Sequence, residues 1–257
     1  MDIIRTQTEL NTAISNRRKQ GDKIGFVPTM GALHAGHISL IHRARQHGEC
    51  VVVSIFVNPT QFAPHEDFDS YPRDEAQDAK NLEDAGVDIL FLPTEKTLYP
   101  NGHDTDIKAD ISANGLETVF RPHFFDGVVN VVSRLFTAVK PDIAVFGEKD
   151  FQQLQVIKEM VTKENLPIEI IGAPIIRDKD GLALSSRNTY LSESELLVAR
   201  QLNKILTIAS QSQDIETAKA SLLSAGFDKI DYVEMRWNRV LAAAWIGKTR
   251  LIDNISL

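Results

Sequence analysis

Short apolar runs alternate with amphipathic stretches from the N-terminus to about residue 176. The runs are rich in Val, Ile and Phe and are bounded by polar or glycine-containing turns, which is typical of buried parallel strands joined by helices. We therefore expect an α/β fold whose core is a Rossmann-like parallel sheet. The expected strands are 23–28, 50–57, 88–92, 142–146 and 168–172, and the expected helices are 39–47, 73–85, 128–139 and 152–164.

The pattern changes after Ile176. Ser192 and Glu195 have the spacing of a capping box, which predicts a helix that continues to about residue 210. A second helix is expected at 215–224, followed by short strands near 232–237 and 250–255. The sequence thus predicts a larger domain, 1–176, and a smaller α+β C-terminal domain, 177–257.

Composition narrows the functional classes. The chain has 257 residues, 43% of them apolar, which is enough for two cores. Its net charge of −7 and the lack of long Lys or Arg runs argue against a nucleic-acid surface. The single cysteine, Cys50, excludes an internal disulfide and is expected to be packed. No signal peptide or membrane-length apolar segment stands out, so we expect a cytoplasmic protein without membrane contact.

Residues 26–37 carry the most informative motif. A short apolar strand leads through a turn into a helix on which His34 and His37 are three residues apart. Gly31 and Gly36 allow a ligand to approach the backbone, and a helix N-terminus attracts anions. These features predict a phosphate site. A packing role or a zinc site are the alternatives, but no further ligands complete a zinc set.

Three other segments carry polar groups directly after apolar runs. The loop 180–188 offers two hydroxyls and a guanidinium, from Ser185, Ser186 and Arg187, although this is also ordinary turn composition. Lys149 follows the strand 142–146, at the sheet edge where α/β proteins bind ligands. Asn58 and Gln61 follow the strand 50–57 and offer neutral amides for the hydroxyl and carboxylate groups of an acid.

The sequences of these segments resemble those of the pantoate–β-alanine ligases, a family related to nucleotidylyltransferases and class I aminoacyl-tRNA synthetases. The resemblance spans nearly the whole chain. It rests on Pro-Thr-Met-Gly-Ala-Leu-His-Ala-Gly-His, Phe-Val-Asn-Pro-Thr-Gln-Phe, Phe-Gly-Glu-Lys-Asp-Phe-Gln-Gln-Leu, Asp-Gly-Leu-Ala-Leu-Ser-Ser-Arg-Asn and Thr-Arg-Leu-Ile-Asp-Asn.

The resemblance implies an AMP-forming ligation in two steps. The carboxylate of (R)-pantoate attacks the α-phosphorus of ATP and gives pantoyl adenylate and pyrophosphate. The amine of β-alanine then attacks the acyl carbon and releases AMP and pantothenate, a step of vitamin B5 and coenzyme A biosynthesis. The resemblance also implies a homodimer, and the small domain is expected to act as a lid over ATP.

The resemblance and the chemistry of the side chains together assign residues to three roles, with Asn58 assigned by residue type alone. The expected catalytic residues are His34, His37, Lys149 and Arg187. Gln61, Gln153 and Asn58 are expected to bind substrate. ATP is expected to contact Met30, Gly31, Ala32, Leu33, His34, Ala35, Gly36, His37, Gly147, Glu148, Lys149, Asp150, Ile176, Leu184, Ser185, Ser186 and Arg187.

The metal ligands stay open. Mg²⁺ is expected with ATP, but it usually keeps several waters and needs few protein ligands. Gln77 and Asp78 are weak candidates, because they lie on a polar helix where a solvated face is the simpler interpretation.

One segment departs from the family. The family pattern Arg-Pro-Gly-His-Phe-x-Gly-Val reads Arg-Pro-His-Phe-Phe-Asp-Gly-Val at 121–128, so Phe124 stands where the family has histidine. His123 either replaces that histidine or the contact is lost, so neither residue is included in the catalytic set. The chain also ends soon after Asn254, which suggests a trimmed C-terminal domain.

Two other functions remain open. A nucleotidyl transferase would share the phosphate motifs, but it would need neither an amine substrate nor the paired amides Gln61 and Gln153. A non-catalytic nucleotide-binding module is the other alternative, yet it has no need for two histidines, a lysine and an arginine around one phosphate group.

Overall fold

The computed structural model describes residues 1–62, 68–69, 71–103 and 107–257. The chain divides into two compact units. The first unit comprises residues 1–148 and 152–173, and the second unit comprises residues 149–151 and 174–257. The division predicted at Ile176 lies in the segment that follows Ala173.

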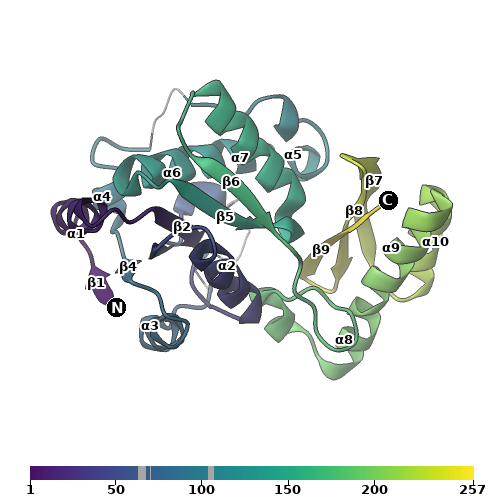
Figure 1. The fold of residues 1–257 in the computed structure, drawn as a ribbon. Helices are drawn as coiled ribbons and strands as arrows, with labels where there is room; N and C mark the ends of the chain where they lie inside the picture. The colour runs from purple at the N-terminus through teal and green to yellow at the C-terminus, as the bar shows by residue number, and fades with distance from the viewer. Residues whose placement is uncertain (63–67, 70, 104–106) are drawn as a thin grey trace. The chain divides into compact units, whose positions relative to one another are not determined.

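The first unit contains a six-stranded parallel sheet, which confirms the predicted α/β fold (Figure 1). The strand order is β1-β4-β3-β2-β5-β6. The strands are β1 (Asp2–Ile4), β2 (Ile24–Thr29), β3 (Cys50–Ile55), β4 (Ile89–Phe91), β5 (Ile143–Gly147) and β6 (Glu169–Ala173). The chain leaves β2 toward β3 on one side and returns to β5 on the other, so a topological switch point lies between β2 and β5.

Helices cover both faces of this sheet. Ile41 and Ala44 of α2 (Ala35–Arg45) and Leu82 of α3 (Glu75–Asp84) pack in one hydrophobic cluster with Val27 and Val53 of the strands. On the other face, Phe136 of α6 (Phe124–Val139) meets Phe26 and Phe146 edge to face. The first unit also contains α1 (Gln7–Lys19), α4 (Glu95–Leu98), α5 (Glu117–Phe120), most of α7 (Phe151–Lys163) and the short 3₁₀ turns η1 (Pro59–Gln61) and η2 (Ile111–Ala113).

Cys50 lies at the start of β3 and is fully buried. Burial raises the pKa of its thiol to about 11, so the thiolate is scarce near neutral pH. The expectation that Cys50 is a packed residue is therefore confirmed.

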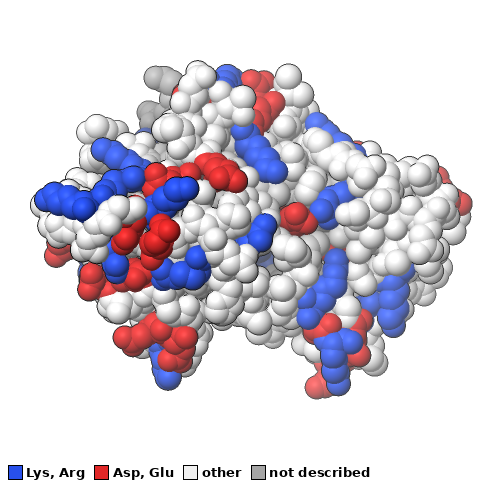
Figure 2. Space-filling model, in the orientation of Figure 1, with Lys and Arg blue, Asp and Glu red and all other residues white. Residues whose placement is uncertain are grey.

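Charges of both signs are interleaved on the face of the first unit that carries α1. Figure 2 shows Lys and Arg side chains mixed with Asp and Glu around α1, at the left of the view. Two arginines of that helix are paired, Arg17 with Asp88 at 2.8 Å and Arg18 with Asp142 at 3.2 Å. Positive charge on this side is thus balanced locally by carboxylates rather than gathered into a basic face.

The second unit is a three-stranded antiparallel sheet, β7 (Lys229–Arg236), β8 (Arg239–Ile246) and β9 (Thr249–Ser256), with three helices. The helices are α8 (Glu193–Ala199), α9 (Gln201–Ser212) and α10 (Ile215–Ser224). The capping box of Ser192 and Glu195 is confirmed at the start of α8. The single long helix expected there is wrong, because α8 ends and α9 begins around Arg200. Strand β8 was not predicted.

Candidate functional site

Three of the predicted segments follow adjacent strands of the first unit. The segment with Asn58 and Gln61 follows β3, the motif with His34 and His37 follows β2, and Gly147 ends β5. Because β3, β2 and β5 are neighbours and parallel, their carboxyl ends share one edge of the sheet. The topology therefore gathers these segments at the switch point, where open α/β sheets bind ligands.

His34 and His37 are side by side, but not in the way expected. The helix α2 begins at Ala35 rather than near residue 39, and His34 is its N-cap. The Nδ1 atom of His34 accepts the N–H of Gly36 at 3.1 Å, and Nδ1 of His37 accepts the N–H of His34 at 3.3 Å. The two rings, whose centroids are 4.2 Å apart, thus form a reciprocal capping box.

This capping arrangement fixes the orientation of both imidazoles. A ring whose Nδ1 accepts a hydrogen bond carries its proton on Nε2 when it is neutral. Each histidine can then donate from Nε2 to an oxygen atom while Nδ1 holds the helix start. Two such donors at a helix N-terminus suit the oxygens of a phosphate chain.

The turn before His34 is held by a carboxylate from α3. Asp78 accepts the N–H of Ala32 at 2.9 Å and the N–H of Leu33 at 2.8 Å. Its side chain lies in the interior, with the residue 4% exposed, so the expectation of a solvated face is wrong for Asp78. Gln77 is exposed, as expected. The amides of Ala32 and Leu33 therefore already have an anionic partner within the protein.

Asn58 lies too deep to meet a substrate directly in this structure. It is fully buried and forms the N-cap of η1. Its Oδ1 accepts the hydroxyl of Tyr99 at 2.8 Å, and its Nδ2 donates to the carbonyl oxygen of Gly127 at 3.2 Å. The geometry thus makes Asn58 a support for η1, while Gln61, at the end of η1, is half-buried and remains the substrate-binding candidate.

Gly127 allows α6 to lie against η1. A Cβ atom at this position would be 2.4 Å from the carbonyl oxygen of Thr60, and backbone atoms cannot give way as a flexible side chain can. We expect Gly127→Ala to lower the free energy of unfolding by about 1–3 kcal/mol, since α6 or η1 must shift. Thermal and urea denaturation would measure this. Gly147→Ala, whose Cβ would meet only Leu40 at 3.9 Å, is the control, and equal losses in both variants would contradict the explanation.

The segment that departs from the family pattern also supports Gln61. Arg121 donates from Nη2 to the backbone carbonyl of Gln61 at 3.2 Å, and its guanidinium lies 3.7 Å from the ring centroid of Phe124. His123 is exposed at the start of α6. Phe124 thus serves as a stacking partner for Arg121, a role that motif reading could not reveal.

The two glutamines at the start of α7 have different surroundings. Gln152 is buried, accepts the N–H of Glu117 and donates to backbone carbonyls of the segment 112–115. Gln153 is half-buried. Gln152 therefore fixes a loop, and Gln153 is the one of the pair that stays a substrate-binding candidate.

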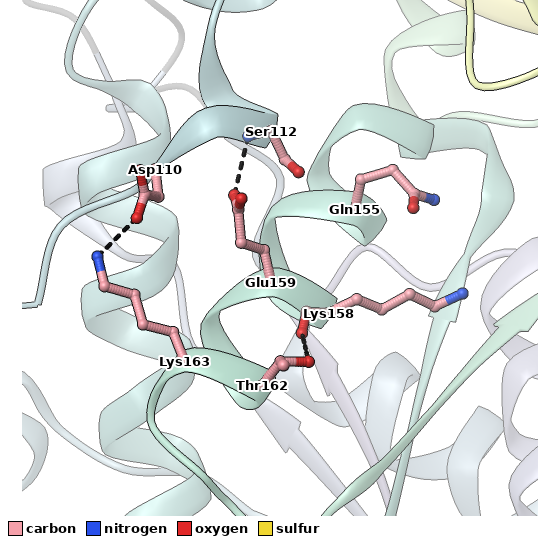
Figure 3. A pocket seen from close by; sticks show the side chains of 7 residues that line it. All are labelled: Asp110, Ser112, Gln155, Lys158, Glu159, Thr162 and Lys163. Carbon is pink, nitrogen blue, oxygen red and sulfur yellow. Dashed lines mark hydrogen bonds and ion pairs between the residues drawn. The ribbon is translucent and has the colours of Figure 1, made fainter.

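A separate hollow of about 530 Å³ lies beside α7, and none of the predicted site residues lines it (Figure 3). Lys163 pairs with Asp110 at 2.7 Å across it, and Glu159 accepts the N–H of Ser112 at 2.8 Å. Its other lining residues are Gln155, Lys158 and Thr162. The residues that line this hollow are all polar or charged, and none of them belongs to the predicted site.

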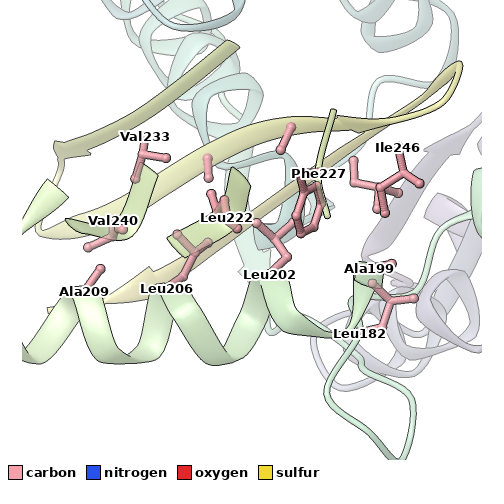
Figure 4. Packing of buried hydrophobic residues seen from close by; sticks show 14 of the residues in the cluster. Leu182, Ala199, Leu202, Leu206, Ala209, Leu222, Phe227, Val233, Val240 and Ile246 are labelled. Carbon is pink, nitrogen blue, oxygen red and sulfur yellow. The ribbon is translucent and has the colours of Figure 1, made fainter. Parts of the chain in front are cut away.

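The second unit has its own core, which supports the remaining candidates. Figure 4 shows Leu202, Leu206 and Ala209 on one face of α9, directed toward Val240 and the sheet. This spacing of four and three residues buries one stripe of the helix.

Lys149 and Asp150 belong to the second unit and to the turn η3 (Glu148–Asp150). The carbonyl oxygen of Lys149 accepts a hydrogen bond from Nδ2 of Asn254 at 3.1 Å, and Asn254 on β9 is itself buried. The ammonium of Lys149 lies 3.8 Å from the Asp150 carboxylate. The backbone of Lys149 is thus fixed by β9, while its charged end has a loose partner.

The hydroxyl-rich loop is tied down at its base. Arg177 donates to Asp253 through two hydrogen bonds, Nη1 to Oδ2 at 2.7 Å and Nη2 to Oδ1 at 2.8 Å. Leu184 donates its N–H to the carbonyl of Ile176 at 2.9 Å. Ser185 then caps the 3₁₀ turn η4 (Ser186–Tyr190) by accepting the N–H of Arg187 at 3.3 Å.

Asp178 reinforces the same loop. Burial raises the pKa of its carboxyl, but the N–H groups of Leu182 and Asp180 and the guanidinium of Arg200 lower the pKa by more, so the net shift is downward. A carboxyl with a lowered folded pKa stabilises the protein above its unfolded pKa and loses that effect as the pH falls.

This sign gives a pH prediction. Below about pH 4, the ordinary pKa range of aspartate, the wild type should lose stability more steeply than Asp178→Asn, which has no charge to lose. Urea unfolding at a series of pH values between about 3 and 7 would measure the difference. Identical pH dependence of the two proteins would contradict it.

The predicted ATP residues divide between the units. Met30–His37, Gly147 and Glu148 lie in the first unit, whereas Lys149, Asp150, Ile176 and the loop residues 184–187 lie in the second. Gln61, Gln153 and Asn58 are all in the first unit. In the first unit, most of these residues follow neighbouring strands of the sheet. In the second unit, they lie in the segment 149–150 and in the loop that begins at Ile176.

Two kinds of feature are absent from the part of the chain that the structure describes. No group of three or more His, Cys, Asp or Glu side chains among these residues is arranged to hold a metal ion. None of the described helices has the length and apolar character needed to cross a bilayer.

The fold defines an α/β protein of the Rossmann-like class, with the histidine cap at the carboxyl edge of its sheet. The chain belongs to the pantoate-β-alanine ligase family, whose model matches residues 2–256. It is 51% identical to the pantothenate synthetase of Mesorhizobium japonicum over 276 aligned positions, covering 100% of this chain and 98% of that protein.

Solved structures of the same family resemble this chain over its full length. The pantothenate synthetase of Thermus thermophilus superposes with a TM-score of 0.92 at 38% identity, covering 100% of this chain and 99% of that one. The pantoate-β-alanine ligase of Francisella tularensis, solved in complex with Beta-gamma ATP and Beta-alanine, gives a TM-score of 0.90 at 40% identity, covering 100% and 97%.

Proposed function

We propose that this chain joins (R)-pantoate to β-alanine in an ATP-dependent reaction and so makes pantothenate for coenzyme A biosynthesis. The observation that carries the proposal is the reciprocal cap of His34 and His37, which presents two oriented imidazoles at the switch point of the sheet. Family membership supplies the substrate class.

The proposed reaction proceeds through a pantoyl adenylate. The carboxylate of pantoate attacks the α-phosphorus of ATP, the bond to the bridging oxygen breaks, and pyrophosphate leaves. The amine of β-alanine then attacks the acyl carbon, and AMP leaves with the electron pair of the broken C–O bond. Both nucleophiles belong to substrates, so the protein aligns the reactants and stabilises charge.

The side chains of the site match those tasks. Nε2 of His34 and of His37 would donate to phosphate oxygens, and Lys149 and Arg187 would add positive charge for the departing pyrophosphate. Gln61 and Gln153 would hold pantoate through neutral amides, which leave its carboxylate nucleophilic. The residues that the sequence predicts to contact ATP would hold the nucleotide. Asn58 would act indirectly, by supporting η1.

Mg²⁺ would accompany ATP and neutralise phosphate charge. The donor set of the chain fits an ion held mainly by phosphate oxygens and water, since the oxygens of Asp78 already accept two backbone N–H groups. No residue of the chain is proposed as a dedicated metal ligand.

We also propose a cytoplasmic homodimer that acts on small molecules and binds neither nucleic acid nor membranes. The net charge of −7 and the single buried cysteine support this setting. Sedimentation velocity at micromolar concentration would test the dimer, and a monomer at every concentration would reject it.

The direct test is an assay with ATP, Mg²⁺ and pantoate, in which pyrophosphate and AMP are measured with and without β-alanine. Turnover to AMP and pantothenate only when β-alanine is present would establish the ligase. Repeated AMP transfer without any amine would instead indicate an adenylyl transferase. Nucleotide binding without pyrophosphate release under any condition would reject the proposal.

A further inference from the structure

The turn between β2 and α2 has an unusual backbone. Gly31 and the non-glycine residue Ala32 both have left-handed conformations, with φ of 82° and 51°. Consecutive N–H groups in such a turn can point the same way and form a nest that attracts an anion. A left-handed backbone conformation is strained for a non-glycine residue and persists only where its surroundings hold it.

The anion in this nest belongs to the protein. One carboxylate oxygen of Asp78 accepts the N–H of Ala32, and the other accepts the N–H of Leu33, at 2.9 and 2.8 Å. A second anchor holds the same turn, because Thr29 Oγ1 accepts the N–H of Gly31 at 3.2 Å and donates to the carbonyl of Ser54 at 2.8 Å. The turn is thus fixed from α3 and from β3.

The space around this contact is too small for an added side-chain atom on Gly31. A Cβ atom on Gly31 would lie 2.9 Å from Oδ2 of Asp78. His34 follows Leu33 directly, and its backbone N–H and ring Nδ1 are both engaged in the cap that orients His37. A shift of the turn therefore moves the atoms on which the orientation of both imidazoles depends.

We propose that Asp78 is a positioning residue. It holds the 31–33 turn so that the imidazoles of His34 and His37 are aligned with the phosphates of ATP for adenylate formation. This inference rests on the proposed function. It also implies that ATP does not use the amides of Ala32 and Leu33. Because a misplacement of about 1 Å can cost about 100-fold in rate, a loosened turn affects chemistry more than folding.

Asp78→Asn tests the contact with little change in shape. The asparagine oxygen can accept one of the two N–H groups, but its amide nitrogen opposes the other, donor against donor. We expect the single-turnover rate of pyrophosphate release to fall about 10- to 100-fold. Asp84→Asn is the matched control on the same helix, since Asp84 is exposed and pairs only with Lys80 in the described structure, and it should keep the wild-type rate.

Two further measurements separate positioning from other roles. If Asp78 were a metal ligand, the Mg²⁺ concentration for half-maximal rate would rise strongly in Asp78→Asn, whereas positioning leaves it unchanged. The amides of Ala32 and Leu33 should exchange hydrogen faster in Asp78→Asn than in the wild type, while the amides of β2 keep their protection.

Gly31→Ala provides a second route if Asp78→Asn folds poorly. It pushes against the same carboxylate from the other side and should slow adenylate formation as well. Where Asp78→Asn does fold, the double variant should show little added loss. A wild-type rate in folded Asp78→Asn, or a shifted Mg²⁺ requirement, would overturn the inference. Failure of the wild type to release pyrophosphate would instead count against the proposed function.

Discussion

His37→Ala is expected to slow adenylate formation by about 100- to 1,000-fold while ATP affinity falls less than about tenfold. A donor that meets charge developing in the transition state affects turnover more than ground-state binding. Rapid-quench measurement of pyrophosphate release gives the rate, and equilibrium titration with a non-hydrolysable ATP analogue gives the affinity.

His37 has one observed contact and one proposed role, which must be separated. Its Nδ1 accepts the N–H of the N-cap residue His34, and its other ring nitrogen is the proposed donor to phosphate. Glutamine is, with glutamate, one of the two usual residues at this third helical position of a capping box, so His37→Gln can restore the cap without the imidazole. If His37→Gln recovers thermal stability but not rate, the loss belongs to the phosphate contact.

His42→Ala is the control for this experiment, because His42 is an exposed histidine near the end of the same helix. It should leave both rate and affinity unchanged. Equal weakening of ATP binding and of turnover in His37→Ala would show uniform binding and would reject a transition-state role.

Strands β2 to β5 were predictable because they are largely buried and therefore read as continuous apolar runs. The five expected strands overlap β2 to β6. β1 was not predicted because its three residues are too few to show a period. β8 was not predicted because Ala242, Ala243 and Ala244 favour helix locally, and only pairing with β7 and β9 makes the segment a strand.

The candidate site shows a similar limit. Motifs identified the histidines, because residue type and local spacing are visible in the sequence. The helix start was placed four residues late, since a histidine N-cap is not among the usual capping residues. The partnership of Asp78 with Ala32 and Leu33 spans more than 40 residues and depends on how α3 packs, which no local pattern encodes. The burial of Asn58 beneath Tyr99 was hidden for the same reason.

Asp253→Ala is expected to lower the unfolding free energy of the second unit by about 3 kcal/mol. Asp253 has only 2% of its side chain exposed and accepts two hydrogen bonds from Arg177, so its removal leaves a charged guanidinium without its main partner. The expected value is at the low end of the range for buried pairs, because Arg177 keeps 21% of its side chain exposed and can still reach water.

Tryptophan fluorescence is suited to this measurement, because the two tryptophans of the chain, Trp237 and Trp245, both lie in the second unit. Urea unfolding followed at these residues should show a lower midpoint for Asp253→Ala, while Glu216→Ala, at an exposed pair with Lys219, should overlay the wild type. In a double-mutant cycle, Arg177→Ala should cost little more once Asp253 is gone. Additive losses would mean that the pair is not coupled, and that the base of the 177–187 loop is held instead by its backbone contacts, such as Leu184 to Ile176.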